Sequence, residues 1–318
     1  MKKLFFFFII TVATYSVFAQ DSTRRDTVKV GVYITSIHDI DFKQKEYALH
    51  LWLWLKYRNR DFDFMKNLEV PQAKSVEKSF AVIDSSGEEL YMQMKLQCVM
   101  KDSWKTENFP FDRQTLRFSI ENSQYDSRSL VFLPDTVGEH FDKRFTLRSW
   151  SIDSCIISTG IKLYETGFGD EKLVRPHTEY SNFKVRLSIK REATGLFWKM
   201  FLGMYLAFLI AYVCFYIHAD GMDSRFGLSV GSLFAVIGNK YIVDSSLPES
   251  TTFTLVDTLH GLTLFMIFLT ITATAYSMQL VKKNLYKKAL RFDMVAAQVV
   301  LVLYILLNAY FILAASSD

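Results

Sequence analysis

The sequence is poor in the residues and motifs on which many enzymes and small secreted proteins depend. Three cysteines in 318 residues are too few for a disulfide framework; Cys98 and Cys155 could pair, whereas Cys214 lies in an apolar run and is expected to pack there. The six histidines are scattered, and the chain has no HExxH or CxxC motif and no phosphate-cradling loop. We therefore expect neither an enzyme nor a bound metal or cofactor.

Charge is balanced, and hydrophobicity is uneven. The net charge is +4 and the basic residues are dispersed except for one cluster, so we do not expect nucleic acid as a partner. Residues 1–19 combine two lysines, an apolar stretch too short to span a membrane and small residues at positions 17 and 19, which is typical of a signal peptide. An exported soluble domain is expected over residues 20–192, and four apolar runs indicate a membrane domain over residues 193–318.

Residues 20–192 show a period of two, the period of a β-strand with one face in a core. Turn signals such as Ser85-Ser86-Gly87 separate the alternating segments, and no long helical pattern intervenes. We therefore predict an all-β sandwich. Its clearest alternating segments are residues 28–34, 90–98, 116–120 and 183–189.

One further strand is apolar on both faces. Leucines at positions 49, 51, 53 and 55 take one face, and the other face carries His50, Trp52 and Trp54. A sandwich buries only one face of each strand. The outward tryptophans are either a stray aromatic rim or a subunit interface or ligand surface, and we favour the second interpretation.

The stretch from Asp223 to Pro248 predicts a membrane helix with two unlike faces. Its apolar part, residues 226–243, just crosses a hydrocarbon core of about 30 Å at about 1.5 Å per residue. Asn239 and Lys240 lie inside this part, so other helices should shield them. Steps of four and three residues place an acid, three glycines, two aromatic rings and a hydroxyl on one stripe: Asp223, Gly227, Gly231, Phe234, Gly238, Tyr241 and Ser245.

Two interpretations of this stripe are open. Gly227 and Gly231 could form a small-xxx-small contact between two helices. A water-filled pore explains more of the stripe, because it begins at an acid, ends at a hydroxyl and repeats glycine, a poor helix former. We therefore predict that the stripe lines a pore, in which Phe234 and Tyr241 narrow the lumen and an apolar ring gates by dewetting.

The segment ENFPFDRQTL, residues 107–116, resembles the signature loop of the pentameric ligand-gated ion channel superfamily. In that family a loop between two strands of the extracellular sandwich reads phenylalanine-proline-phenylalanine-aspartate, any residue, glutamine. The cysteines that flank the loop in animal members are replaced here by Asp102 and Leu116, as in the bacterial branch. The matching residues are Phe109, Pro110, Phe111, Asp112 and Gln114.

The resemblance covers nearly the whole chain after residue 19 and implies roles for individual residues. Trp52 falls where an aromatic of the complementary binding face sits, Arg191 falls where a basic residue precedes the first membrane helix, and Pro248 belongs to the turn after the pore helix. The stripe that begins at Asp223 coincides with the family's pore-facing positions. The loop at residues 109–112 and the turn at Pro248 are then expected to meet at the membrane surface and to carry the gating bias.

The apolar runs predict membrane helices at about residues 196–217, 226–243, 259–280 and 294–315. Four helices put both chain ends on one side. The link after the third helix holds five basic residues between 282 and 291, whereas residues 244–257 and the C-terminal tail hold none. This asymmetry predicts a multi-pass protein of the cytoplasmic membrane, with its N-terminal domain and C-terminus on the periplasmic side.

The ligand site is less explicit in the sequence. Residues from Tyr164 to Tyr180, with Phe168 near the middle, resemble the hairpin that caps the family's binding pocket, and Phe141 falls in another loop of that pocket. Aromatic faces there commonly hold cationic amines, but Phe168 and Phe141 could equally be rim packing. The agonist could be a small molecule or a proton.

Together these features predict a homopentamer in membrane lipid that conducts monovalent cations when a ligand at subunit interfaces shifts a closed-open equilibrium. Five copies of Asp223 at the cytoplasmic mouth should concentrate cations, whereas Arg225 lies about 200° further round the helix and should point off the axis. The alternative is a periplasmic sensor or binding domain anchored in the membrane without conductance. That alternative explains the sandwich but neither the four helices nor the stripe.

Overall fold

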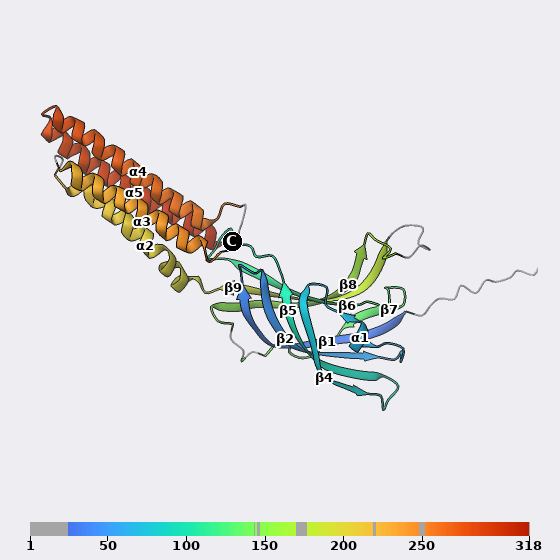
Figure 1. Cartoon of the computed structure of the whole chain (residues 1–318). Helices are drawn as coiled ribbons and strands as arrows, with labels where there is room; N and C mark the ends of the chain where they lie inside the picture. Colours follow the sequence, from blue (N-terminus) through green and yellow to red (C-terminus); the bar gives the residue numbers. More distant parts are fainter. Residues whose placement is uncertain are drawn as a thin grey trace, which may run out of the picture.

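The computed structural model describes residues 25–142, 144, 147–169, 177–218, 221–247 and 252–317. These residues form a strand-rich part followed by four long helices (Figure 1). The expected signal peptide at residues 1–19 and the turn residue Pro248 lie outside the described residues.

The strand-rich part contains nine strands in two sheets, as far as the described residues go. One sheet has the order β4-β5-β2-β1-β7 and the other the order β3-β6-β9-β8. All pairings are antiparallel except that of β1 with β7. The strands are β1 (Asp26–Asp41), β2 (Glu46–Tyr57), β3 (Leu68–Glu69), β4 (Ala73–Asp84), β5 (Leu90–Lys101), β6 (Arg113–Asn122), β7 (Leu130–Pro134), β8 (Trp150–Tyr164) and β9 (Thr178–Arg191), with the short helix α1 (Phe64–Asn67) before β3.

The alternation in the sequence becomes the core between the sheets. The four leucines of β2 at positions 49 to 55 are buried, as are Phe118 of β6 and Leu187 of β9. This confirms the predicted sandwich of strands. Cys98 in β5 and Cys155 in β8 are both free, so the pairing considered from the sequence does not form.

Four helices follow, each apolar and long enough to cross a membrane. Polar residues extend most of them beyond the apolar runs: Thr254 and Asp257 form a capping box before the third apolar run. The fourth helix begins at Tyr286, so Lys287, Lys288 and Arg291 are helical and the link is only residues 283–285. The helices are α2 (Ala193–Val213), continued by a 3-10 turn at Cys214–Tyr216, then α3 (Met222–Asp244), α4 (Leu255–Lys282) and α5 (Tyr286–Ser317).

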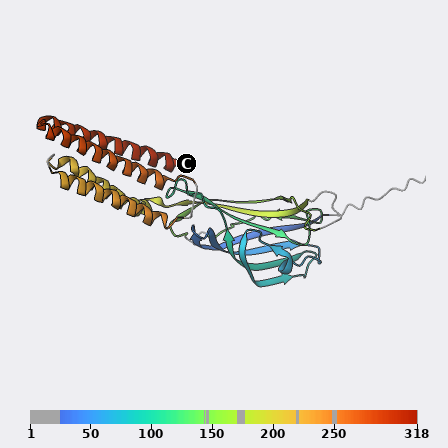
Figure 2. The ribbon, with the colours of Figure 1, turned by 45° about the horizontal axis from the view of Figure 1, so that its top comes forward.

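The helices run side by side away from the sandwich, and Figure 2 shows α2 and α3 as one pair and α4 and α5 as another. Tyr304 of α5 joins the pairs: its ring stacks on Phe208 of α2 at 3.7 Å between centroids, and its hydroxyl lies 2.9 Å from Thr263 Oγ1 of α4. α2 begins and α5 ends where the helices meet the sandwich, so these two helices share that end (Figure 1). This arrangement of the four described helices suits a multi-pass membrane protein.

Candidate functional site

The two faces of α3 have different surroundings. Its buried face carries Arg225, Ser229, Ser232, Val236 and Val243. Every member of the stripe predicted to line a pore is exposed in the single chain, namely Asp223, Gly227, Gly231, Phe234, Gly238, Tyr241 and Ser245. Phe234 and Tyr241 are 67% and 77% exposed, so no other helix of the described chain covers these two rings.

The glycines of the stripe are not packing against another helix of the same chain. A Cβ atom added at Gly227, Gly231 or Gly238 would meet nothing within 4 Å. By contrast, a Cβ at Gly203 of α2 would lie 3.2 Å from Asn239 Nδ2, as expected of a close helix-helix contact. Within one chain, therefore, the small-xxx-small interpretation does not account for Gly227 and Gly231.

Residues 227–231 also spell G-x-S-x-G, a pattern shared with the nucleophile elbow of hydrolases. An elbow places its serine on a sharp turn between a strand and a helix. Ser229 instead lies within α3, is 1% exposed and contacts Cys214 Sγ at 3.2 Å. The structural context of a nucleophile is absent from this segment.

The polar residues inside the membrane length of α3 face α4, as expected from the cost of exposing them to lipid. Asn239 Oδ1 lies 2.9 Å from Nε2 of the fully buried His260. Lys240 Nζ lies 2.7 Å from Asp257 Oδ1 and also bonds Asp244 one turn along α3. These contacts fix the rotation of α3 and keep its other face outward.

The loop between β5 and β6 packs against the end of the helices that is nearest the sandwich. Phe109 is buried among helix residues, and its peptide bond to the buried Pro110 is cis. The Phe111 ring lies 5.6 Å from that of Phe197 in α2. The amide of Leu255 donates to the carbonyl of Glu107 at 2.8 Å, which ties the start of α4 to the same loop.

Asp112 and Arg191 form a bidentate ion pair where β9 leads into α2. Arg191 Nε donates to Asp112 Oδ1 at 2.7 Å and Nη2 donates to Oδ2 at 3.2 Å. The guanidinium carbon lies 4.0 Å from the ring centre of Trp150 and under 5 Å from those of Phe42 and Phe109. The pair is therefore enclosed by aromatic rings and almost shielded from water.

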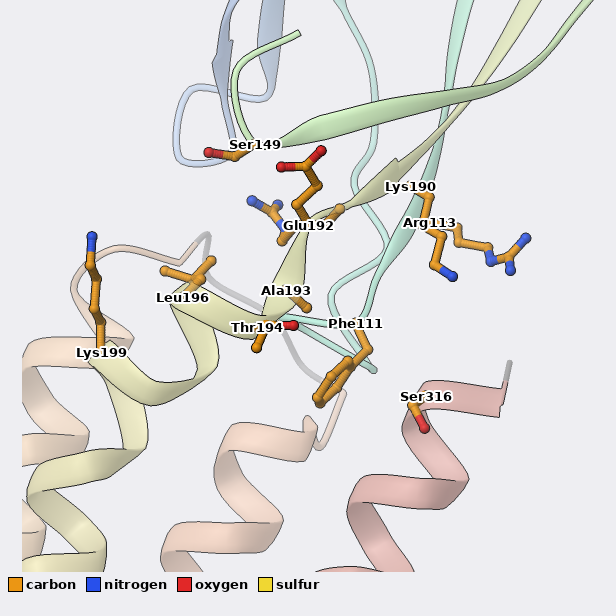
Figure 3. A pocket seen from close by; sticks show the side chains of 12 residues that line it. Phe111, Arg113, Ser149, Lys190, Glu192, Ala193, Thr194, Leu196, Lys199 and Ser316 are labelled. Atoms are coloured by element: carbon orange, nitrogen blue, oxygen red, sulfur yellow. The ribbon is translucent and has the colours of Figure 1, made fainter.

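A pocket of 920 Å³ opens beside this pair (Figure 3). Phe111, the first turn of α2 and Ser316 near the end of α5 line it, so the signature loop and both terminal membrane helices border one space. Residues 109–112 and Arg191, which the sequence predicts to act in gating, therefore lie together in the structure at the boundary between the sandwich and the helices.

An aromatic cluster lies where β8 ends and β9 begins, at the end of the sandwich away from the helices (Figure 1). This is the position of the expected capping hairpin. Tyr164, Phe168 and Tyr180 lie edge to face, with ring centroids 5.5 to 6.2 Å apart. Tyr164 donates to Glu121 Oε2 at 2.8 Å, and Asn182 donates to the other oxygen. Burial raises the pKa of Tyr164, the bond to Glu121 raises it further, and burial also raises the pKa of Tyr180. Both phenols are therefore neutral at physiological pH.

Two of the predicted ligand residues lie elsewhere in the chain. Trp52 is on the outer face of the five-stranded sheet, where its ring is 6.4 Å from that of Phe80. Phe141 bridges to Ile34 and packs against the sandwich core, so rim packing accounts for it. One chain therefore does not bring either residue to the aromatic cluster. Trp54, also suggested as a binding surface, is instead engaged in its own sheet: it covers Gly31 and donates to Asp135.

Sequence reasoning missed Glu121 and Asp293. Glu121 follows the alternating run of β6 on the face away from the core, and a carboxylate there, next to the expected hairpin, was a usable signal. Asp293 is 95% shielded in α5 and pairs with Arg225 of α3. An acid directly before the apolar run predicted at residues 294–315 was the corresponding signal.

No known family model matches the sequence, and no curated protein sequence is significantly similar to it. Functional assignment consequently rests on the residues and geometry above.

Proposed function

We propose that this protein is the subunit of a homopentameric ligand-gated ion channel of the Cys-loop receptor type that conducts monovalent cations. The observation that carries this proposal is the exposed face of α3. A row of glycines, one acid and a hydroxyl faces outward along a helix whose opposite face is packed. Glycine is a poor helix former, so its recurrence on one face needs a reason. A water-filled lumen with a carboxylate at one end of the helix and a hydroxyl at the other supplies that reason.

A ring of identical chains satisfies that requirement. If α3 of each copy faces a common axis, the stripe lines water, and the large apolar residues exposed on α2 and α5 face lipid or neighbouring subunits. The number five comes from the resemblance of the signature loop. In this ring Asp223 forms a carboxylate collar at one mouth and Phe234 forms the narrowest apolar collar.

The aromatic cluster supports a ligand site at the subunit interface. The cluster presents three aromatic rings beside the Glu121 carboxylate, and this combination suits a small cationic amine. Lys162 Nζ already lies 5.7 Å from the Tyr164 ring centre, so an amine would displace a cation that the protein itself supplies. Trp52, on the other sheet, would reach the cluster only from a neighbouring subunit.

The membrane orientation follows from charge. The five basic residues around the α4-α5 turn lie at the end of the helices away from the sandwich. Basic links tend to face the cytoplasm, and on that basis we propose that the sandwich and the C-terminus lie on the periplasmic side of the inner membrane. Phe109–Asp112, Arg191 and the turn at Pro248 would then carry ligand-induced movement to α3.

Conductance across a planar bilayer, recorded from the purified full chain during a screen of amines and a pH ramp, tests the proposal. Ligand-dependent currents are expected from the parent protein. Gly231→Trp should abolish them, because its side chain would enter the lumen. Gly261→Trp, at an equally open glycine on α4, is the matched control and should conduct.

Folded, membrane-inserted protein that passes no current under any of these conditions would refute the channel and favour the membrane-anchored sensor. Equal currents from Gly231→Trp and Gly261→Trp would refute the position of the pore. Native mass spectrometry of the detergent-solubilised protein checks the number of subunits separately.

A further inference from the structure

The side chain of Arg225 is held away from the exposed stripe by a buried acid on another helix. Arg225 lies in the first turn of α3, two residues after Asp223, and is 1% exposed. Its Nη2 lies 2.8 Å from Oδ2 of Asp293, which belongs to α5. Its Nε donates to the carbonyl of Ile217 at 3.1 Å, and Nη2 also contacts that carbonyl.

The burial of the Arg225 side chain depends strongly on Asp293. Arg225 Nη1 and Asp293 Oδ1 have no hydrogen-bond partner within the described part of the chain, so the pair is joined through one side of each group. The other anchor of the guanidinium is a neutral carbonyl. A buried guanidinium that loses its acid is strongly destabilised and moves toward water where it can. Under the pore arrangement, the nearest water is at the mouth that Asp223 lines.

We propose that Asp293 is a positioning residue for charge selection: it holds Arg225 out of the mouth, so that Asp223 determines the sign of the permeating ion. This inference rests on the proposed channel function. Without the pair, five guanidinium groups would join five carboxylates at the same mouth and cancel their field. A helix at the outside of the bundle would therefore set a property of the pore.

Reversal potentials in a sodium chloride gradient test the proposal. Asp293→Asn keeps the shape of the side chain and removes its charge, and it should lower the cation-to-anion permeability ratio on the order of tenfold. The double variant Arg225→Gln with Asp293→Asn removes both charges and should restore the ratio. If Asp293 were only a structural link, Asp293→Asn would reduce the number of channels without moving the reversal potential.

The outcomes separate this inference from the channel proposal. A parent channel whose reversal potential follows chloride would refute the proposed cation selectivity. A cation-selective parent with an unchanged Asp293→Asn variant would refute the role of Asp293 alone.

A second pair of variants keeps the inference testable if Asp293→Asn does not fold. In liposomes, a charged thiol reagent should modify Asp223→Cys and leave Arg225→Cys unmodified, with the parent chain and its three native thiols as background. Mass spectrometry reads the modification without any need for current. Modification of Arg225→Cys as complete as that of Asp223→Cys would overturn the inference, because position 225 would then face the mouth.

Discussion

Removing the carboxylate of Asp112 should destabilise the boundary between the sandwich and the helices. Asp112 accepts two bonds from Arg191 and a third from Gln114 Nε2 at 2.7 Å, and it is 2% exposed. In Asp112→Ala the guanidinium would remain enclosed by Trp150 and two phenylalanine rings with no acid beside it. A buried charge that has lost its partner is strongly destabilising.

The expected loss is about 3 to 5 kcal/mol of unfolding free energy, as for other broken buried pairs. Ring contacts to the guanidinium, each worth about 0.5 to 2 kcal/mol, survive the substitution and hold the loss within that range. The chain supplies a matched control in Arg113 and Asp153, which pair at 2.9 Å but are about half exposed. Asp153→Ala should cost only about 0 to 1 kcal/mol.

Thermal and chemical unfolding of the full chain in detergent measures both variants. Trp150, whose ring lies against the guanidinium, is one of the five tryptophans that contribute to the fluorescence signal. Asp112→Ala should unfold at clearly lower denaturant than Asp153→Ala, and surviving channels should open less readily. Equal stability of the two variants, or normal gating of Asp112→Ala at normal surface expression, would refute the reasoning.

Three further perturbations test other parts of the molecule. Asp223→Ala should lower cation selectivity, because it removes the carboxylates from the mouth; reversal potentials that follow chloride in the parent would contradict this. Phe234→Ala should raise resting conductance, and Tyr241→Ala should do so less, because a phenol hydroxyl tolerates water. Unchanged resting current with a large loss of folded pentamer would instead place Phe234 between helices, where its truncation costs about 3 to 5 kcal/mol. His50→Gln should weaken the acid sensitivity of unfolding between about pH 7.5 and 5.5. Burial and the adjacent His38 lower the pKa of His50, so the folded chain binds that proton less readily than the unfolded chain, and stability is lost as pH falls through about 6.5. An identical pH dependence in parent and variant would exclude His50 as its source.

Local periodicity explains why much of the architecture could be predicted. A strand between two sheets must place every second residue in the core, so the leucines of β2 revealed their burial by spacing alone. The stripe on α3 was visible for the same reason, since glycines and acids at steps of three and four residues share one face of any helix. Boundaries were less accurate: α5 begins eight residues before the predicted span because Tyr286 to Asp293 continue the helix with polar residues.

Partners far apart in the sequence explain what was missed. Trp54 was assigned to a possible binding surface because nothing nearby indicated that Gly31 lies beneath its ring and Asp135 accepts from its nitrogen, 81 residues away. Phe141 looked like a pocket residue until its bridge to Ile34 placed it against the core.

Arg225 shows how a prediction from the sequence can lack its physical cause. The helical angle from Asp223 was enough to predict that the arginine points off the axis. Angle alone does not keep a long, flexible, charged side chain buried, because the desolvation of a guanidinium outweighs any preference of the helix for one direction. The acid that offsets this cost is 68 residues further on, in α5, where the helical spacing of α3 gives no sign of it. Under the proposed channel function, charge selection at the mouth of α3 would therefore involve two helices, because the burial of Arg225 on α3 depends on Asp293 of α5.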